Sequence, residues 1–145
     1  MTPPIWTPLE SSPSVWNAYM RDILSNDPPL HWVDVLSTDD WALEMIPTRV
    51  HAVVLVYPTS DESSSASDDA TRLSPNDAKV AFCPQTIRNA CGTIALVHAL
   101  RNVPMMRPYA TETSLLHKLD GNVEELFKDL HHQHAQAGDT DASET

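Results

Sequence analysis

The stretch from Pro84 to Leu100, PQTIRNACGTIALVHAL, constrains the fold more than any other part of this chain. From Ala90 to Leu100 its residues are apolar nearly all round, which predicts a helix that other elements cover on every side. Cys91 stands where this helix begins. Unpaired backbone N–H groups and the helix dipole favour a thiolate at such a position, and the thiolate is the nucleophilic form of cysteine. The stretch therefore predicts a buried helix with a reactive thiol at its start.

Other segments carry helical patterns that can cover this helix. The first begins at Ser12 and is ended by Pro28-Pro29, and the others span residues 37–46, 113–119 and 122–132. In the first, Ser12 can cap the helix and Pro13 fits its first turn, ahead of apolar residues spaced i, i+4 and i+8. In the last, Asn122 and Glu125 have the spacing of a capping box. We expect a break between the last two helices at residues 120–121.

Residues 50–57, VHAVVLVY, form the best strand pattern in the chain. They are rich in β-branched residues and almost continuously apolar, which predicts a central strand covered on both faces. A shorter extended piece covers residues 80–83. Residues 58–79 are rich in Ser, Asp and Thr and predict a flexible surface loop, and residues 133–145 predict a disordered polar tail. The expected fold class is therefore α+β.

Composition argues against several classes of protein. The chain has 145 residues, of which 41% are hydrophobic, enough for one domain or part of one. A net charge of -11 argues against nucleic-acid binding, because nothing neutralises a row of phosphates. No apolar run approaches the length of a membrane span, and the first residues lack the pattern of a signal peptide. With only two cysteines, Cys83 and Cys91, we expect no disulfide framework and a reducing, cytoplasmic compartment.

A buried structural role is the commoner fate of a lone cysteine, so Cys91 needs further support as a nucleophile. Ala90 and Gly92 remove side-chain bulk around the sulfur, which an approaching substrate requires. Gln85, six positions upstream, supplies an amide donor. Together with the backbone N–H of Cys91 it could bind a developing oxyanion. These residues favour nucleophilic catalysis by a thiol.

The motif QTIRNACGTI over residues 85–94 resembles the active-site signature of the ubiquitin carboxy-terminal hydrolases, a family of papain-like cysteine peptidases. The resemblance extends over about residues 6–130. Further matches precede the motif in the chain and stand in the family's order. They are Trp6-x-Pro8-Leu9-Glu10-x-x-Pro13, Trp32-Val33-Asp34-Val35, Ile46-Pro47 and Ala52 to Pro58. It implies the family's fold, with helices around a central antiparallel sheet.

The resemblance implies a role for each matched position. Cys91 would be the nucleophile and Gln85 the oxyanion donor. The segment that contacts ubiquitin would include Pro8, Leu9, Glu10 and Pro13. The implied reaction is hydrolysis at the C-terminal glycine of ubiquitin, in ubiquitin-dependent protein catabolism, which releases small adducts or peptides through an acyl-enzyme. Ubiquitin or a ubiquitin-like modifier is the implied partner, and no metal or other cofactor is implied.

The family also uses residues that these 145 positions do not supply. Its members place the general-base histidine and the orienting aspartate on strands beyond a flexible crossover loop. No apolar strand with a histidine follows Cys91 here. We therefore expect residues 1–132 to be the N-terminal part of a catalytic domain, truncated before the C-terminal strands, and residues 133–145 to begin the crossover loop. Alone, the chain should be inactive.

None of the seven histidines can take the place of that base. His98 lies on the same helix as Cys91, but the two Cα atoms are about 10 Å apart. His117 belongs to a predicted surface helix. A patch of three more lies at a helix end, at His131, His132 and His134. Without cysteine or carboxylate ligands at suitable spacing, we expect no zinc site there.

Two other functions stay open. The first is a catalytically dead ubiquitin-binding fragment, or a truncated product, that keeps the N-terminal contact segment without the chemistry. The second is an unrelated interaction domain in which the motif is a coincidence. A ubiquitin probe with a C-terminal electrophile separates an enzyme from a binder, because only a formed site lets Cys91 react.

Overall fold

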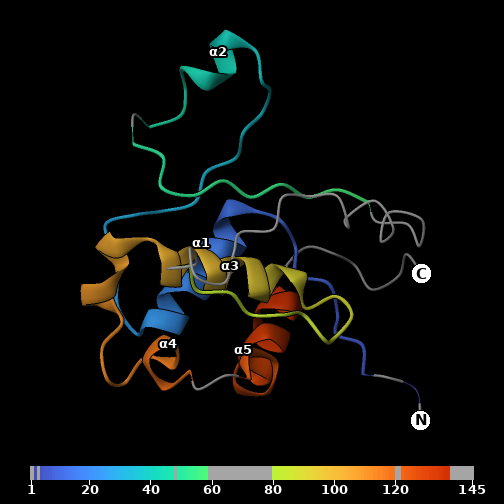
Figure 1. Ribbon diagram of the computed structural model, residues 1–145. Helices are drawn as coiled ribbons and strands as arrows, with labels where there is room; N and C mark the ends of the chain where they lie inside the picture. The colour runs from blue at the N-terminus through green and yellow to red at the C-terminus, as the bar shows by residue number, and fades with distance from the viewer. Residues whose placement is uncertain (1, 3, 48, 59–79, 120–121, 138–145) are drawn as a thin grey trace.

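The computed structural model describes residues 2, 4–47, 49–58, 80–119 and 122–137. Its helices are α1 (Pro13–Leu24), α2 (Asp40–Leu43), α3 (Cys91–Asn102), the 3-10 helix η3 (Pro104–Tyr109), α4 (Leu115–Lys118) and α5 (Val123–Ala137) (Figure 1). Helix α3 packs against α4, α5 and η3, while α1 packs against α4 and α5. Within these ranges, no helix is both long enough and apolar enough to cross a membrane.

Helix α1 begins where the sequence predicts but ends at Leu24, before the predicted stop at Pro28. The Ser12 side chain accepts a hydrogen bond from the Val15 backbone N–H at 3.4 Å, and Pro13 occupies the first turn. Ser25 ends the helix in the left-handed conformation, with φ 51°. The predicted apolar stripe is buried and consists of Val15, Trp16, Tyr19, Met20, Ile23 and Leu24. The predicted start and apolar stripe of this helix are confirmed.

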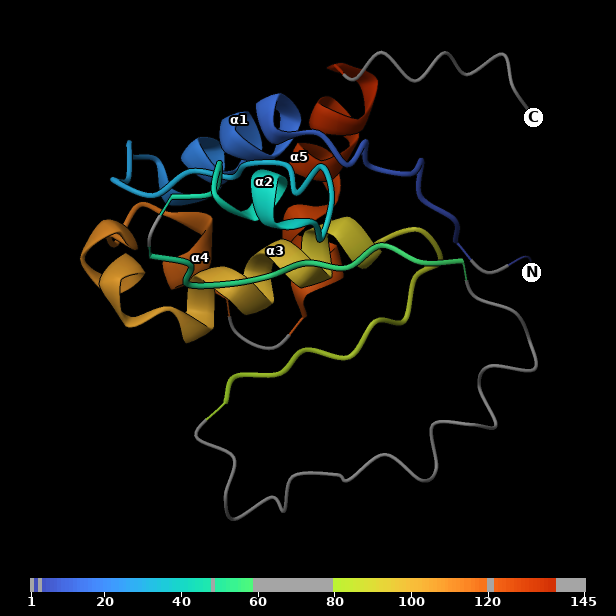
Figure 2. The ribbon, with the colours of Figure 1, turned by 90° about the horizontal axis from the view of Figure 1, so that it is seen from above.

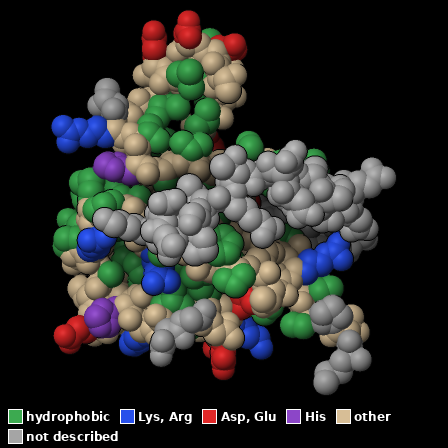
Figure 3. All heavy atoms as spheres, viewed as in Figure 1, with side chains coloured by type: hydrophobic (Ala, Val, Ile, Leu, Met, Phe, Trp, Pro, Cys, Tyr) green, Lys and Arg blue, Asp and Glu red, His purple; other side chains and the backbone are tan. Residues whose placement is uncertain are grey.

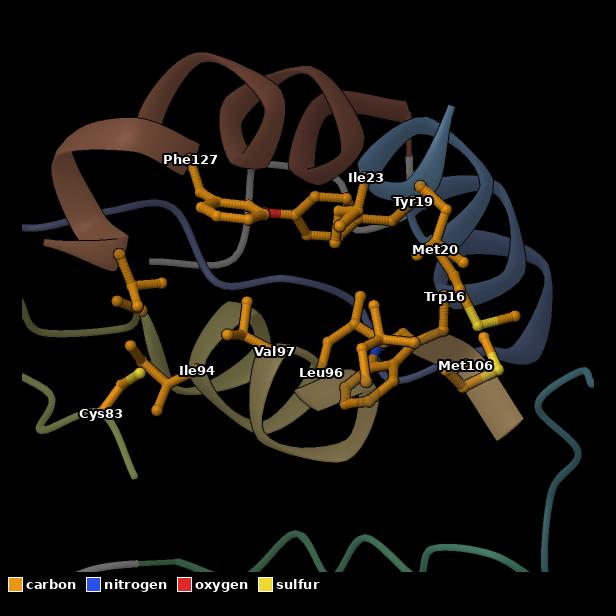
Figure 4. Packing of buried hydrophobic residues seen from close by; sticks show 14 of the residues in the cluster. Trp16, Tyr19, Met20, Ile23, Cys83, Ile94, Leu96, Val97, Met106 and Phe127 are labelled. Atoms are coloured by element: carbon orange, nitrogen blue, oxygen red, sulfur yellow. The ribbon is translucent and has the colours of Figure 1, made fainter. Parts of the chain in front are cut away.

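The core lies where α1, α3 and α5 meet. Helix α3 buries Thr93, Ile94, Leu96, Val97 and Leu100, as the pattern of the sequence predicts. Tyr19 of α1 and Phe127 of α5 point toward one another above this helix (Figure 4). Both side chains are fully buried. Helix α3 therefore packs against η3, α4 and α5 and shares a core with α1.

The remaining helices differ from their predicted bounds. Residues 37–46 contain only the four-residue α2, and residues 113–119 only α4. Helix α5 continues to Ala137, five residues past its predicted end. It continues because His134 and Ala135 are buried, although a polar composition predicts exposure. The predicted break at 120–121 and the rest of the predicted tail, 138–145, lie outside the described residues.

The predicted central strand is not formed in the described part of the chain. Residues 50–57 have no regular secondary structure, and the side chains of Val53 and Leu55 are 79% and 77% exposed. A strand needs a neighbour whose N–H and C=O groups complete its hydrogen bonds. Between described residues the only β-pairing is an isolated parallel bridge between Ile5 and Arg88. The predicted piece at 80–83 is also irregular, so the described residues are helical and the α+β class is not confirmed.

Leu30 and Trp32 pack against the helical core. The chain then leaves the helical body, carries α2, and returns with residues 49–58, which run along α3 (Figures 1 and 2). Between this excursion and the helices lies an open hollow of about 960 Å³, lined from one side by residues 50–54 and from the other by Leu100 and Met106. Hydrophobic side chains gather on the excursion (Figure 3), including the exposed Trp41 and Met45. The predicted loop over 59–79 lies outside the described residues.

A matched pair of leucine substitutions tests this arrangement. Leu96→Ala should lower the free energy of unfolding by about 3 kcal/mol, because Leu96 is fully buried in α3. Leu55→Ala should change it by less than about 0.5 kcal/mol, because Leu55 is mostly exposed. Urea unfolding followed by circular dichroism measures both. A large loss for Leu55→Ala would mean that residues 50–57 are buried after all.

Candidate functional site

Cys91 is the first residue of α3, and its side chain is exposed. The first hydrogen bond of the helix runs from the Ile94 N–H to the Ala90 carbonyl, at 3.1 Å. The backbone N–H groups of Cys91, Gly92 and Thr93 therefore have no acceptor within the helix. Such N–H groups and the helix dipole favour negative charge at this end. Cys83, by contrast, is buried, and neither thiol forms a disulfide.

A tight turn brings the chain to Cys91. Asn89 adopts the left-handed conformation, with φ 66°, which asparagine tolerates better than most residues. Its side-chain amide donates to the Trp6 carbonyl at 2.9 Å. The Ala90 N–H donates to the Ile87 carbonyl at 3.3 Å. The motif's asparagine therefore ties the turn to the N-terminal segment.

Gln85 lies in the same turn, with an exposed side chain. Its Nε2 donates to the Ile87 carbonyl at 2.9 Å. Between the described residues, no hydrogen bond joins Gln85 to Cys91. A side-chain amide nitrogen has two N–H groups, so one remains for a ligand.

The N-terminal segment packs directly on this motif. The Trp6 N–H donates to the Arg88 carbonyl at 3.0 Å. Leu9 covers Gly92 so closely that a Cβ atom on Gly92 would lie 3.0 Å from Leu9 Cδ2 and 3.1 Å from Leu9 Cβ. Only glycine fits beneath this leucine without a shift. The structure therefore brings Leu9 into contact with the cysteine motif, 83 positions along the chain.

The other predicted ubiquitin contacts lie on either side of Leu9. Pro8 is exposed, Glu10 is half-buried, and Pro13 begins α1. The Glu10 Oε2 atom is buried and has no hydrogen-bond partner among the described residues. The segment presents exposed positions next to a residue anchored on the motif.

Behind the motif lies a buried polar network that the sequence did not reveal. Thr93 Oγ1 lies 2.6 Å from the Tyr19 hydroxyl and 2.8 Å from His131 Nδ1. His131 Nε2 lies 2.7 Å from the Thr7 carbonyl, which can only accept, so Nε2 is the donor. A neutral His131 then accepts from Thr93, and Thr93 accepts from Tyr19. Burial raises the pKa of the Tyr19 phenol, although its hydrogen bond with Thr93 acts in the other direction.

His131 joins α5 to the N-terminal segment. Its ring lies 4.3 Å from the Trp6 ring, between centroids. Burial lowers the pKa of His131, as does the neighbouring His132, and both outweigh the opposing effect of the Thr7 carbonyl. The neutral ring is therefore favoured at neutral pH. The only signal in the sequence was the histidine-rich end of this helix, which gave no indication of a buried partner.

The other hydrogen-bonded histidines have partners other than Cys91. His98 Nε2 accepts from the Cys83 N–H at 2.7 Å, and His134 Nε2 lies 2.7 Å from Asp22 Oδ2. In the described ranges, no histidine hydrogen-bonds to the Cys91 sulfur. Those ranges also contain no group of three or more His, Cys, Asp or Glu residues that could hold a metal ion.

The comparison with known families agrees with the motif. The family profile described as ubiquitin carboxyl-terminal hydrolase, family 1, matches residues 6–145. This chain belongs to that family. The resemblance stated from the sequence is therefore confirmed.

Individual members of the family 1 hydrolases align over different lengths. Ubiquitin carboxyl-terminal hydrolase 3 of Arabidopsis thaliana is 40% identical over 101 residues, which are 68% of this chain and 43% of the relative. A ubiquitin carboxyl-terminal hydrolase of Aplysia californica is 35% identical over 150 residues, covering 94% of this chain and 69% of the relative. Isozyme L1 of Homo sapiens is 32% identical over 98 residues, covering 66% and 44%. The chain spans less than half the length of two of these three relatives.

A double-mutant cycle tests the contact between Leu9 and Gly92 in this family 1 chain. Gly92→Ala should lower the free energy of unfolding by about 1 kcal/mol, because the new methyl group meets Leu9. In a Leu9→Gly background the same change should raise it by about 0.5 kcal/mol, because alanine favours helix over glycine. Urea unfolding of the four proteins gives the coupling. Equal effects in both backgrounds would exclude the contact.

The pH dependence of stability tests the His131 network. The pKa of His131 is lower in the folded chain than its ordinary value of 6.5, so the unfolded chain binds more protons below that pH. The free energy of unfolding should therefore fall as pH drops through 6.5 toward the folded pKa, by up to about 1.4 kcal/mol per pH unit. Urea unfolding between pH 8 and about pH 5.5 measures this slope. His131→Gln should remove this contribution, whereas His117→Gln, at an exposed position of α4, should leave it. An unchanged slope in His131→Gln would contradict the assignment.

Proposed function

We propose that this chain carries the nucleophilic half of a thiol-dependent deubiquitinating hydrolase, which acts at the C-terminal glycine of ubiquitin. The observation that carries the proposal is the placement of Cys91. Its sulfur is exposed at the start of a buried helix, within the motif of the family to which the chain belongs. A cysteine needed only for packing would be buried, as Cys83 is.

In this reaction the Cys91 thiolate attacks the carbonyl carbon of the ubiquitin C-terminal glycine. The carbonyl oxygen becomes an oxyanion, which the free N–H of Cys91 and one amide N–H of Gln85 would bind. Collapse of the intermediate expels the amine and leaves a thioester, which water then hydrolyses. The expelled amine must take up a proton, and this step requires a general acid. The exposed Pro8 and the anchored Leu9, with Glu10 and Pro13, would contact ubiquitin.

We propose further that residues 1–145 alone turn over such substrates poorly or not at all. The support is that three histidines of the described ranges hydrogen-bond to groups other than Cys91, and none bonds to its sulfur. Without a base the thiol is not activated, and without an acid the leaving amine is not protonated. The base would come from outside these residues, with residues 1–132 as the N-terminal part of the catalytic domain and 133–145 as the start of a crossover loop.

The papain-like arrangement of helices around a central antiparallel sheet is also part of the proposal. Residues 50–57 have the composition of a strand, lie beside α3, and expose most of their apolar side chains. Pairing with further strands would cover those side chains and complete the backbone hydrogen bonds. We place the protein in the cytoplasm, where both free thiols would stay reduced.

A ubiquitin probe with a C-terminal alkylating group tests the proposal on the 145-residue chain. The probe should form a covalent adduct on Cys91, located by peptide mass spectrometry. Cys91→Ala should abolish the adduct, and Cys83→Ala, which removes the buried thiol, should leave it. Hydrolysis of a ubiquitin C-terminal amide should not exceed the rate of Cys91→Ala.

The outcomes separate the alternatives. Binding of ubiquitin without an adduct would favour a catalytically dead ubiquitin-binding protein, for which the anchored N-terminal segment is the supporting observation. The absence of both ubiquitin binding and an adduct would contradict the proposed function. Hydrolysis that Cys91→Ser abolishes would contradict the expected inactivity alone.

A further inference from the structure

Glu124, the second residue of α5, points into the turn that precedes Cys91. Its side chain is only 5% exposed. Oε1 accepts hydrogen bonds from the backbone N–H groups of Thr86 and Ile87, each at 2.7 Å. Oε2 accepts from the Thr86 hydroxyl. A single carboxylate therefore binds three donors in a segment about 38 positions away along the chain.

The charge of Glu124 is balanced by these donors rather than by a cation. In the described ranges, no lysine or arginine forms an ion pair with it. Burial by itself raises the pKa of the Glu124 carboxyl, but the hydrogen bonds from Thr86 and Ile87 outweigh burial and hold the pKa below its ordinary value. The first turn of α5 also favours an anion. Glu124 is therefore ionised at neutral pH and stays bound to the turn.

The backbone of Ile87 connects Glu124 to Gln85 and to the residue before Cys91. Its N–H is held by Glu124. Its carbonyl accepts from Gln85 Nε2 at 2.9 Å and from the Ala90 N–H at 3.3 Å, one residue before Cys91. The backbone of this one residue thus contacts Glu124, the oxyanion donor of the proposed function and the start of the nucleophile's helix.

We infer that Glu124 is a positioning residue, which holds the segment from Gln85 to Ala90 in the shape that leads into Cys91 and that keeps the Gln85 amide on the Ile87 carbonyl. The inference about the turn stands on the hydrogen bonds, and the inference about catalysis rests on the proposed function. The carboxylate does not touch the substrate. It acts only through Thr86 and Ile87.

Three substitutions separate this role from a general structural one. Glu124→Gln keeps an acceptor for both N–H groups and can donate to the Thr86 hydroxyl, so it should preserve the turn. Glu124→Ala removes every acceptor. Glu124→Asp keeps the charge but shortens the side chain by one methylene group, which moves the oxygens away from the turn. It is the disruptive variant to use if Glu124→Ala does not fold. Asp129→Ala, an exposed position of the same helix, is the control for lost charge.

The first measurement is amide hydrogen exchange by NMR on the whole chain. Exchange at Thr86 and Ile87 should be about tenfold or more faster in Glu124→Ala and Glu124→Asp, relative to exchange at Val97 in α3. It should stay within about twofold of the wild type in Glu124→Gln and Asp129→Ala. Unchanged exchange in both disruptive variants, or a glutamine variant as fast as alanine, would overturn the inference.

The second measurement compares the affinity for a ubiquitin C-terminal aldehyde with that for unmodified ubiquitin. The Cys91 sulfur adds to the aldehyde carbon, and the thiol proton moves to the former carbonyl oxygen, so the preference for the aldehyde reports on the oxyanion site. Glu124→Asp should reduce that preference by about tenfold or more, with the affinity for unmodified ubiquitin unchanged, and Glu124→Gln should retain it. A full preference in Glu124→Asp despite faster exchange would overturn the positioning role. A wild type with no preference would contradict the proposed function, while the exchange data would still decide whether Glu124 holds the turn.

Discussion

The structure depends on the start of α3, where the side chains change from exposed to buried within three residues. Cys91 is exposed, while Thr93 is completely buried and hydrogen-bonded on two sides. The Thr93 hydroxyl connects α3 to Tyr19 of α1 and to His131 of α5, and His131 continues the connection to the N-terminal segment. Because a buried hydroxyl without partners is costly, these elements are held at one relative placement. That placement leaves the sulfur at the surface of a rigid centre.

Two buried polar side chains of α5 support the motif by different means. Glu124 keeps its charge because backbone N–H groups replace the water it has lost. His131 is favoured in its neutral form because a carbonyl fixes one ring nitrogen as the donor and leaves the other as an acceptor. Both residues bind the main chain of a distant segment. Helix α5 therefore shapes the site without contributing a group to the proposed reaction.

Local signals in the sequence predicted the parts of the fold that local energetics decide. The cap at Ser12 and the apolar stripe of α1 are visible within one helix, and both are confirmed. The apolar pattern of α3 predicted the helix and most of its burial, although Ala95, His98 and Ala99 are only half-buried. The strand prediction for residues 50–57 failed because the pattern indicates only a preference for strand. A strand forms only where a neighbouring strand pairs with it. The sequence did not predict the last turn of α5, because its residues are polar. His134 is buried there by stacking on Tyr19 and by a hydrogen bond to Asp22, and an apolar pattern in the sequence does not indicate such contacts. Of the candidate site, the sequence indicated Cys91 and Gln85. It did not indicate Glu124, whose partners lie about 38 positions away.

The contacts of the N-terminal segment have a consequence for the order of events during synthesis. Trp6 bonds to Asn89, and Thr7 bonds to His131, at separations of 83 and 124 positions. Trp6 and Thr7 therefore leave the ribosome long before their partners Asn89 and His131 are synthesised. Contacts that close such long loops form late, because their entropy cost must be met first. Until then Leu9 cannot cover Gly92, and Trp6 remains in contact with solvent and with whatever chaperone binds exposed aromatic side chains. The surroundings of the thiol are thus completed at the end of folding, although the cysteine motif itself is synthesised well before α5.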